Sequence, residues 1–377
     1  MPSFLRSSRL PYRRLALTML LAVLLPACHA DAGAAQAQAA APVPVDPLDQ
    51  AQLRKALGAL RPQRPGVTDL YVVGFAGDAS EDVFRNETVY LRQLFAQRFG
   101  AAGRIVTLIN HANNLGAHAY APQASYDNLA DTLQRIGKLM DRREDALLLF
   151  LTSHGTEQHE LYVQFGPGED ADYDTITPKE LRGLLDDAGI GNRVIVLSAC
   201  YSGGFVPALK SPDTLIITAA RRDRPSFGCG NTTSATYFGR AWLIDALART
   251  IDFVESYRLA TAEITQREQA EGEAASYPQL YVGARIAPLL QRWRAQLQPG
   301  AAPAYPYPEP ETETETPANT AMETAAAPEP TGDGKAAAKQ ETASIADADG
   351  EIKDAAAGSA HAHAPASAPP SAAASRH

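Results

Sequence analysis

Continuously apolar runs alternate with amphipathic stretches along the middle of the chain, between about residues 51 and 297. Five of the apolar runs have the length of a strand, and their pattern is that of parallel strands covered by helices on both faces. They lie at 69–76, 104–109, 145–152, 193–198 and 214–218. The chain is therefore expected to form five buried strands.

Four stretches beside these runs carry apolar residues at spacings of three and four, which predicts helices that pack on the strands. They lie at 83–99, 126–140, 178–185 and 237–247. Thr177 and Pro178 give the third helix an N-cap and a first-turn proline. Strands that alternate with helices predict an α/β fold with a mostly parallel central sheet, in which functional sites gather at the carboxyl ends of the strands.

The N-terminal end of the chain has the layout of a bacterial export signal. Four arginines precede a short apolar run at 15–25, which is too short to span a bilayer. The sequence Leu-Pro-Ala-Cys that ends at Cys28 resembles a lipobox. We therefore predict a signal peptide over 1–27, a lipid anchor on Cys28 and a disordered tether over 28–50, which place the protein in the bacterial cell envelope, facing the periplasm. Secretion after ordinary cleavage behind Ala30 is the alternative.

The net charge of −9 comes mainly from the C-terminal end. Residues 301–377 contain twelve Asp or Glu against four Lys or Arg, and they contain no Leu, Val, Phe or Trp. Such a composition cannot offset the entropy lost on ordering, so we predict a disordered acidic tail over 298–377. The remaining domain, 51–297, is nearly neutral and has no basic patch, which argues against nucleic acid as a partner.

Two reactive side chains follow neighbouring buried strands: His154 comes after 145–152 and Cys200 after 193–198. Adjacent parallel strands end at the same edge of a sheet, so we expect the two side chains within reach of each other. An imidazole at short range increases the thiolate fraction of a cysteine. The spacing therefore predicts a catalytic pair, with the N–H groups of Gly155 and Cys200 as an oxyanion site.

The chain has three cysteines, and an exported protein normally pairs them. A disulfide between Cys200 and Cys229 is therefore one alternative, and a buried, inert Cys200 beside an unrelated loop histidine is another. We favour a free, reactive Cys200, because the two cysteines fall at separate strand–loop junctions and an unpaired exported thiol usually has a chemical reason.

These residues resemble the legumain-like cysteine peptidases, relatives of the caspases, over approximately residues 69–283. The resemblance rests on 148–155, which ends in Ser-His154-Gly155, on 194–203, which contains Ala-Cys200-Tyr-Ser-Gly, and on 217–229, which contains Ser226. It implies a caspase-like three-layer sandwich and hydrolysis of polypeptide substrates through an acyl-enzyme on Cys200, with no metal or organic cofactor.

The substrate pocket that the resemblance implies departs from the family. Legumains carry an acidic residue two positions before the catalytic cysteine and another after a Thr-Tyr-x-Gly run, and both line a pocket for asparagine. Ser198 and Arg240 occupy these positions here. A pocket with Ser198, Ser226 and Arg240 should favour a carboxylate or a small polar side chain. A solvated Arg240 without such a role is the alternative.

Legumains also resemble one another in using an asparagine after the first strand to orient the histidine, and Asp78 is the stand-in here. A carboxylate at this place would hold the imidazole tautomer and stabilise its cation. Asp78 as a simple turn residue is the alternative.

Two other functions of the protein also stay open: transpeptidation through the same acyl-enzyme, and a non-catalytic surface-binding lipoprotein that retains the fold.

Overall fold

The computed structural model describes residues 46–310, so the predicted signal peptide, Cys28 and most of the acidic tail lie outside the described residues. All five predicted strands form, each within one residue of its expected bounds. They are β1 (Leu70–Ala76), β2 (Ile105–Ile109), β3 (Ala146–Thr152), β6 (Arg193–Ser198) and β7 (Thr214–Thr218). In the central sheet they follow the order β2-β1-β3-β6-β7 and run parallel, and β8 (Gln279–Val282) adds an antiparallel edge.

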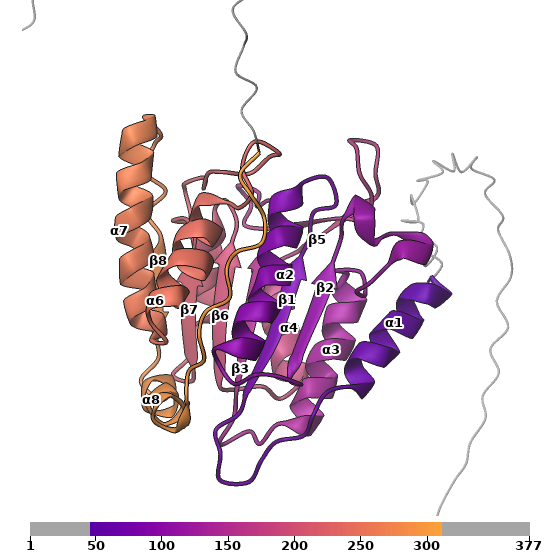
Figure 1. The fold of residues 1–377 in the computed structure, drawn as a ribbon, viewed down its shortest axis with the longest axis vertical. Coiled ribbons are helices and arrows are strands. Elements are labelled where there is room, and N and C mark those ends of the chain that lie inside the picture. The colour runs from indigo at the N-terminus through magenta and orange to yellow at the C-terminus, as the bar shows by residue number, and fades with distance from the viewer. Residues whose placement is uncertain (1–45, 311–377) are drawn as a thin grey trace, which may run out of the picture. The chain divides into compact units, whose positions relative to one another are not determined.

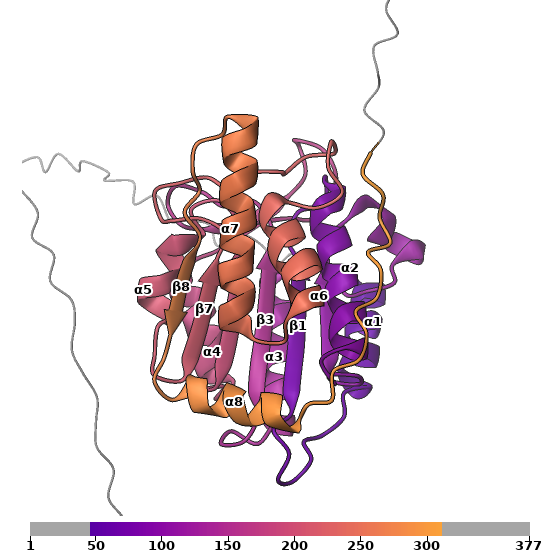
Figure 2. The same cartoon turned by 60° about the vertical axis from the view of Figure 1, so that its left-hand side comes forward.

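Helices cover both faces of this sheet, which gives the predicted three-layer α/β sandwich (Figures 1 and 2). Successive strand residues alternate between the two apolar cores: Val72 faces one, and Tyr71 and Val73 face the other. One layer consists of α2 (Asp82–Gln97), the π-helix Gly239–Ala246 with α6 (Leu247–Arg249), α7 (Phe253–Glu271) and α8 (Ile286–Gln296). The other consists of α1 (Pro47–Gly58), α3 (Tyr126–Leu139), α4 (Pro178–Asp187) and α5 (Val206–Leu209). No helix of residues 46–310 is long and apolar enough to cross a membrane.

The N-terminus of α4 forms as its sequence predicts. The Thr177 hydroxyl accepts the N–H of Glu180, and the Glu180 carboxylate accepts the N–H of Thr177. Pro178 occupies the first turn, where its missing N–H has no cost. Such a capping box is worth about 1 kcal/mol, so this helix start is encoded locally.

The ordered domain extends beyond the predicted bounds of 51–297 at both ends. Asp46 caps α1, and Leu53 of that helix is buried in the core, so the fold begins before residue 51. At the other end, residues 298–310 pack along the domain although a disordered tail was predicted from 298. Tyr305 explains the difference, because its ring is packed against the core and its hydroxyl is hydrogen-bonded. The prediction rests on the absence of Leu, Val, Phe and Trp and leaves out tyrosine, whose ring also buries apolar surface.

Several elements were not predicted. A small hairpin of β4 (Leu161–Gln164) and β5 (Tyr173–Ile176) follows His154. The predicted helix over 237–247 forms mainly as the π-helix. Short 3₁₀ helices occur in the loops at Ala112–Asn114, Gly116–His118 and Ser202–Phe205. These elements lie in or beside the loops at the carboxyl ends of the strands, where the predicted site residues also lie.

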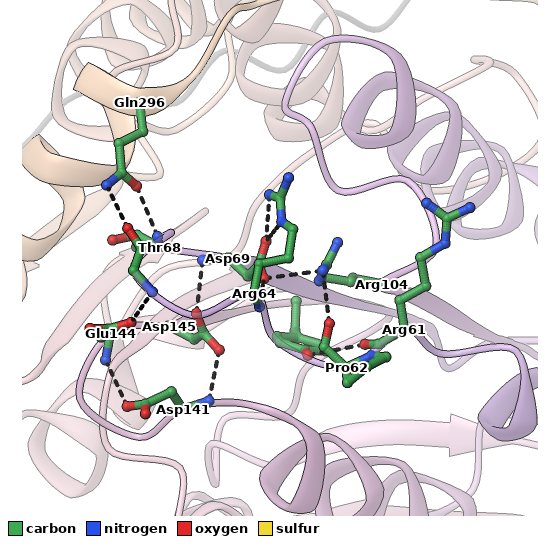
Figure 3. Close-up of polar contacts among 12 residues, drawn as sticks. Arg61, Pro62, Arg64, Thr68, Asp69, Arg104, Asp141, Glu144, Asp145 and Gln296 are labelled. Atoms are coloured by element: carbon green, nitrogen blue, oxygen red, sulfur yellow. Dashed lines mark hydrogen bonds and ion pairs between the residues drawn. The ribbon is translucent and has the colours of Figure 1, made fainter.

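A buried charge cluster ties together the opposite, amino ends of β1 and β3 (Figure 3). Asp69 pairs with Arg64 at 2.6 Å and with Arg104 at 3.1 Å. Asp145 accepts the N–H groups of Asp69 and Asp141, and burial raises the pKa of Asp145 to about 6. Because the cluster lies at the end of the sheet away from His154, we assign it a structural role.

Candidate active site

The sheet brings His154 and Cys200 to the same edge, as the strand-end rule predicts. Thr152 at the end of β3 pairs in register with Ser198 at the end of β6, and each is followed two residues later by a reactive side chain. Gly155 lies against the main chain of Cys200, where an added Cβ would collide with the Cys200 carbonyl oxygen. The loop that carries the histidine therefore touches the loop that carries the thiol.

Cys200 sits at a sharp turn between β6 and the 3₁₀ helix Ser202–Phe205. Tyr201, directly after it, has φ +54°, a left-handed backbone that is uncommon outside glycine and that clusters at functional sites. The Cys200 sulfur accepts the N–H of Ser226 at 3.3 Å, and the Ser226 hydroxyl oxygen lies 3.7 Å away. Ser226, expected in the substrate pocket, thus contacts the sulfur directly and donates to it.

The imidazole of His154 is held by Glu81. Nε2 of His154 lies 3.1 Å from the Glu81 carboxylate, and the other Glu81 oxygen accepts the N–H of Gly230 at 2.6 Å. Phe84 packs edge-on against the imidazole ring. Burial opposes the charged imidazole, but the hydrogen bond and charge of Glu81, with a contribution from Asp78, raise the pKa of His154 overall.

The same pair sets the tautomer of the histidine. Burial alone would raise the pKa of Glu81, yet the contact with His154 lowers it, so Glu81 is a carboxylate at neutral pH. A carboxylate only accepts hydrogen bonds, so Nε2 of His154 carries the proton. Nδ1 is then the unprotonated nitrogen of the neutral ring.

Asp78, predicted as the residue that orients the histidine, does not make that contact. Its carboxylate accepts the N–H groups of Ser80 at 2.8 Å and Glu81 at 3.1 Å, which closes a turn after β1. The contact belongs to Glu81, three residues further on. Asp78 therefore acts on the imidazole through the turn that presents Glu81 and through its charge, and the contact predicted for Asp78 is made by Glu81.

The N–H of Gly155 is available for an oxyanion. The His154 carbonyl accepts the N–H of Tyr162, and the N–H of Thr156 donates to the carbonyl of Glu160. These two bonds flank Gly155 in a local antiparallel bridge, so its own N–H points away from that bridge. Together with its closeness to Cys200, this geometry supports the predicted oxyanion site.

Ser198, predicted to line the substrate pocket, is buried. Its hydroxyl lies 3.3 Å from that of Thr236. The fully buried Glu87 of α2 accepts the N–H of Thr236 and the hydroxyl of Thr152, and burial raises the pKa of Glu87. A carboxyl group from α2 thus lies beneath the strand ends that precede His154 and Cys200. The sequence does not predict this position, because the contact joins distant segments.

Arg240, the other predicted pocket residue, is engaged by the chain itself. Its guanidinium donates to the Ser234 hydroxyl at 2.9 Å, pairs with the carboxylate of Glu309 and lies over the ring of Tyr305 at 4.9 Å. Arg240 is therefore not the freely solvated residue that the alternative expected, and its guanidinium already has partners within the chain. In the described part of the chain, its carboxylate partner is Glu309.

Gly203 and Gly204, which follow Cys200, serve the packing of loops. The main chain at 220–222 lies so close to Gly203 that a Cβ would collide with it, and the ring of His159 fills the same space at Gly204. These glycines therefore let the loop that follows Cys200 pack tightly on its neighbours.

Cys200 and Cys229 are both free thiols, so the alternative of a disulfide between them is wrong. Burial, together with the negative charge of a Cys200 thiolate nearby, raises the pKa of Cys229 well above its usual range. Cys229 is therefore a protonated, unreactive thiol, whereas Cys200 has an N–H donor on its sulfur.

A cavity of about 370 Å³ lies between α1, α2 and the edge strand β2. Its lining includes Lys55, Arg92 and Thr107, and it contains neither His154 nor Cys200. Volume alone does not create a reactive site, so we give this cavity no part in the chemistry.

Comparisons with known proteins agree with the site. The model of the peptidase C13 family matches residues 130–288, a span that contains His154 and Cys200. Among solved structures, caspase-1 from Spodoptera frugiperda is similar to this chain at 13% identity, with a TM-score of 0.38, and the match covers 58% of this chain and 89% of that one. No curated protein matches. The chain is a cysteine peptidase, a hydrolase, and its resemblance to the legumain-like cysteine peptidases is confirmed over the matched residues.

Proposed function

We propose that this protein is a cysteine-type endopeptidase in which Cys200 is the nucleophile and His154 is the general base and then the general acid. The observation that carries the proposal is the contact between two loops at adjacent strand ends. One loop carries Cys200, and the other carries His154 and Gly155. The peptidase C13 match spans the same residues.

The proposed cycle has two halves. Nδ1 of His154 takes the thiol proton, and the Cys200 sulfur attacks the carbonyl carbon of the scissile peptide. The N–H groups of Gly155 and Cys200 hold the oxyanion of the tetrahedral intermediate. As this intermediate collapses, His154 protonates the leaving amine and an acyl-enzyme remains. His154 then deprotonates a water that attacks the thioester, which releases the new carboxylate and restores the thiol.

Glu81 takes the orienting role in this cycle. It fixes the proton on Nε2, so the reactive nitrogen of the ring faces away from Glu81, and its charge stabilises the imidazolium that forms when Cys200 is ionised. Glu81 does not touch the substrate in this scheme. It is a positioning residue that acts through His154.

We do not propose that the enzyme prefers substrates with an acidic side chain, although Arg240 led us to expect that preference from the sequence. The guanidinium already binds a carboxylate of the chain, that of Glu309, together with the Ser234 hydroxyl. A substrate carboxylate would have to displace these contacts. The polypeptide substrate is therefore proposed without an assigned side-chain preference.

We further propose that the enzyme works in the bacterial cell envelope, held to a membrane by lipid on Cys28. The basic start, the short apolar run and the lipobox-like sequence support this location. Cells fed with labelled palmitate are expected to label the wild-type protein and not Cys28→Ser. An unlabelled wild type would leave secretion after Ala30 as the better account.

Selective alkylation of Cys200 tests the proposed pair without a substrate. A free cysteine is only a few per cent thiolate at pH 7, so an effective base can accelerate alkylation by about tenfold or more. We expect iodoacetamide to modify Cys200 about tenfold faster in the wild type than in His154→Ala, with the modified peptide identified by mass spectrometry.

Cys229 supplies an internal control for this experiment, because the same digest reports its modification. It should react slowly in both proteins, since its thiol is buried and protonated. Equal alkylation rates of Cys200 in the two proteins would contradict the proposed pair and would favour a non-catalytic role for the fold.

A further inference from the structure

The chain does not leave the domain at the end of α8. Residues 303–309, here called the C-terminal strap, run along α2 toward the end of the sheet where the predicted site residues lie (Figures 1 and 2). The Tyr90 hydroxyl of α2 donates to the carbonyl of Pro303, and the rings of Tyr90 and Tyr305 pack edge to face at 5.1 Å. Arg85 of the same helix lies over the ring of Tyr307. The strap is thus fixed to α2 at three successive places.

Beyond α2, the strap holds one residue of the loop 226–235. The Glu309 carboxylate accepts the N–H of Ser234 at 2.8 Å and its hydroxyl at 2.9 Å, and it also pairs with Arg240. The Tyr305 hydroxyl donates to the Ser234 carbonyl at 2.7 Å. Both main-chain polar groups of Ser234 are therefore bonded to the strap, so this end of the loop cannot move without breaking charge-assisted bonds.

The other end of the same loop contacts Cys200 directly and reaches His154 through Glu81. The N–H of Ser226 donates to the Cys200 sulfur, and the N–H of Gly230 donates to Glu81, which holds His154. Gly228 and Gly230 both have positive φ, at +84° and +104°. Glycines in such conformations have many alternatives open to them, so the loop needs external contacts to keep one arrangement.

We propose that the C-terminal strap braces the loop 226–235 in its catalytic arrangement, with Glu309 as the positioning residue that acts through Ser234. The strap then belongs to the machinery of the peptidase, although it follows the last helix of the domain. This inference rests on the proposed function of Cys200 and His154. It assigns the strap a supporting role, and so predicts that weakening the strap lowers activity.

The contacts of the strap distinguish this role from that of a plug over the site. Among residues 46–310, the hydrogen bonds and ion pairs of Glu309 go to Ser234 and Arg240, and neither of these residues bonds to His154 or Cys200. A plug should instead contact the nucleophile or the oxyanion site. The strap reaches the catalytic residues only through the loop that it holds.

Substitution of Glu309 in the full chain tests the proposal. Glu309→Ala is expected to lower kcat by about fivefold with little change in KM, and to slow iodoacetamide alkylation of Cys200 by a similar factor. The alkylation measurement matters because a small reagent needs no substrate subsite. Glu309→Gln keeps an oxygen that can accept from Ser234, so it should retain most of the activity that the alanine variant loses.

Two further variants complete the experiment. Tyr305→Phe removes only the hydroxyl that donates to Ser234 and should lower both rates in the same direction by a smaller factor. Asp213→Ala is the matched control, because it breaks another surface pair, with Arg285 at 2.6 Å, at the amino end of β7. Its rates should equal those of the wild type.

The sign of the effect decides between the alternatives. Higher kcat or faster alkylation in Glu309→Ala would show that the strap obstructs the site, and unchanged rates would show that it only packs on the surface. Either result overturns the proposal. If Cys200 of the wild type reacts no faster than in His154→Ala, the catalytic pair itself fails. If the wild type shows that acceleration and Glu309→Ala keeps it, only the bracing role fails.

Discussion

Replacing Cys200 with alanine is expected to reduce peptide hydrolysis by at least about 10⁴-fold, because the acyl-enzyme cannot form without a nucleophile. The remaining groups, the imidazole of His154 and the N–H of Gly155, would still lie in place. They can bind and polarise a carbonyl but cannot divide the reaction into two easier steps. Hydrolysis of a fluorogenic peptide library by the purified variant measures the loss.

Cys229→Ala is the control for this substitution, since it also removes a half-buried thiol from a loop close to the site. It should keep activity within about twofold of the wild type, because Cys229 is protonated and has no part in the cycle. Matching thermal unfolding curves would show that both variants are folded. Two results would contradict Cys200 as the nucleophile: hydrolysis that is retained in Cys200→Ala, or hydrolysis that is lost only in Cys229→Ala.

The parts of this molecule that could be predicted from sequence are those encoded by short-range patterns. The run that becomes β3 is apolar at every position before Thr152 because helices bury both faces of the sheet. The positions of His154 and Cys200 then follow from topology, because adjacent parallel strands end at one edge. The N-terminus of α4 was equally visible, since Thr177 and Pro178 act within a single turn.

The parts that could not be predicted depend on contacts between distant segments. Asp78 and Glu81 are both acidic and three residues apart, and only the turn after β1 decides which of them meets His154. The strap is a stronger case, because Tyr305 and Glu309 look like parts of a polar, proline-rich tail. Their ordered conformation depends on Tyr90 and Ser234, which lie more than 200 and more than 70 residues away in sequence, respectively.

The second large effect is expected at Glu81. Glu81→Gln should lower kcat/KM by about 10²-fold, a loss in the range of general acid–base catalysis. The charge that stabilises the imidazolium disappears, and a single amide oxygen must serve both His154 and the N–H of Gly230. Because Glu81 raises the pKa of His154 against the opposing effect of burial, its loss should lower that pKa. The limb of the pH–rate profile on which His154 titrates should therefore move to lower pH.

Two neighbouring carboxylates make this prediction specific. Asp82→Asn removes the next acidic residue, which holds a different histidine, His111, at 2.7 Å, and should leave both rate and profile unchanged. Asp78→Asn should move the His154 limb in the same direction by less, since Asp78 acts on the imidazole by charge without a hydrogen bond. A larger loss of rate in Asp78→Asn than in Glu81→Gln would show that Asp78, and not Glu81, orients His154. The carboxylate in contact should dominate, because a hydrogen bond fixes the tautomer and a distant charge does not.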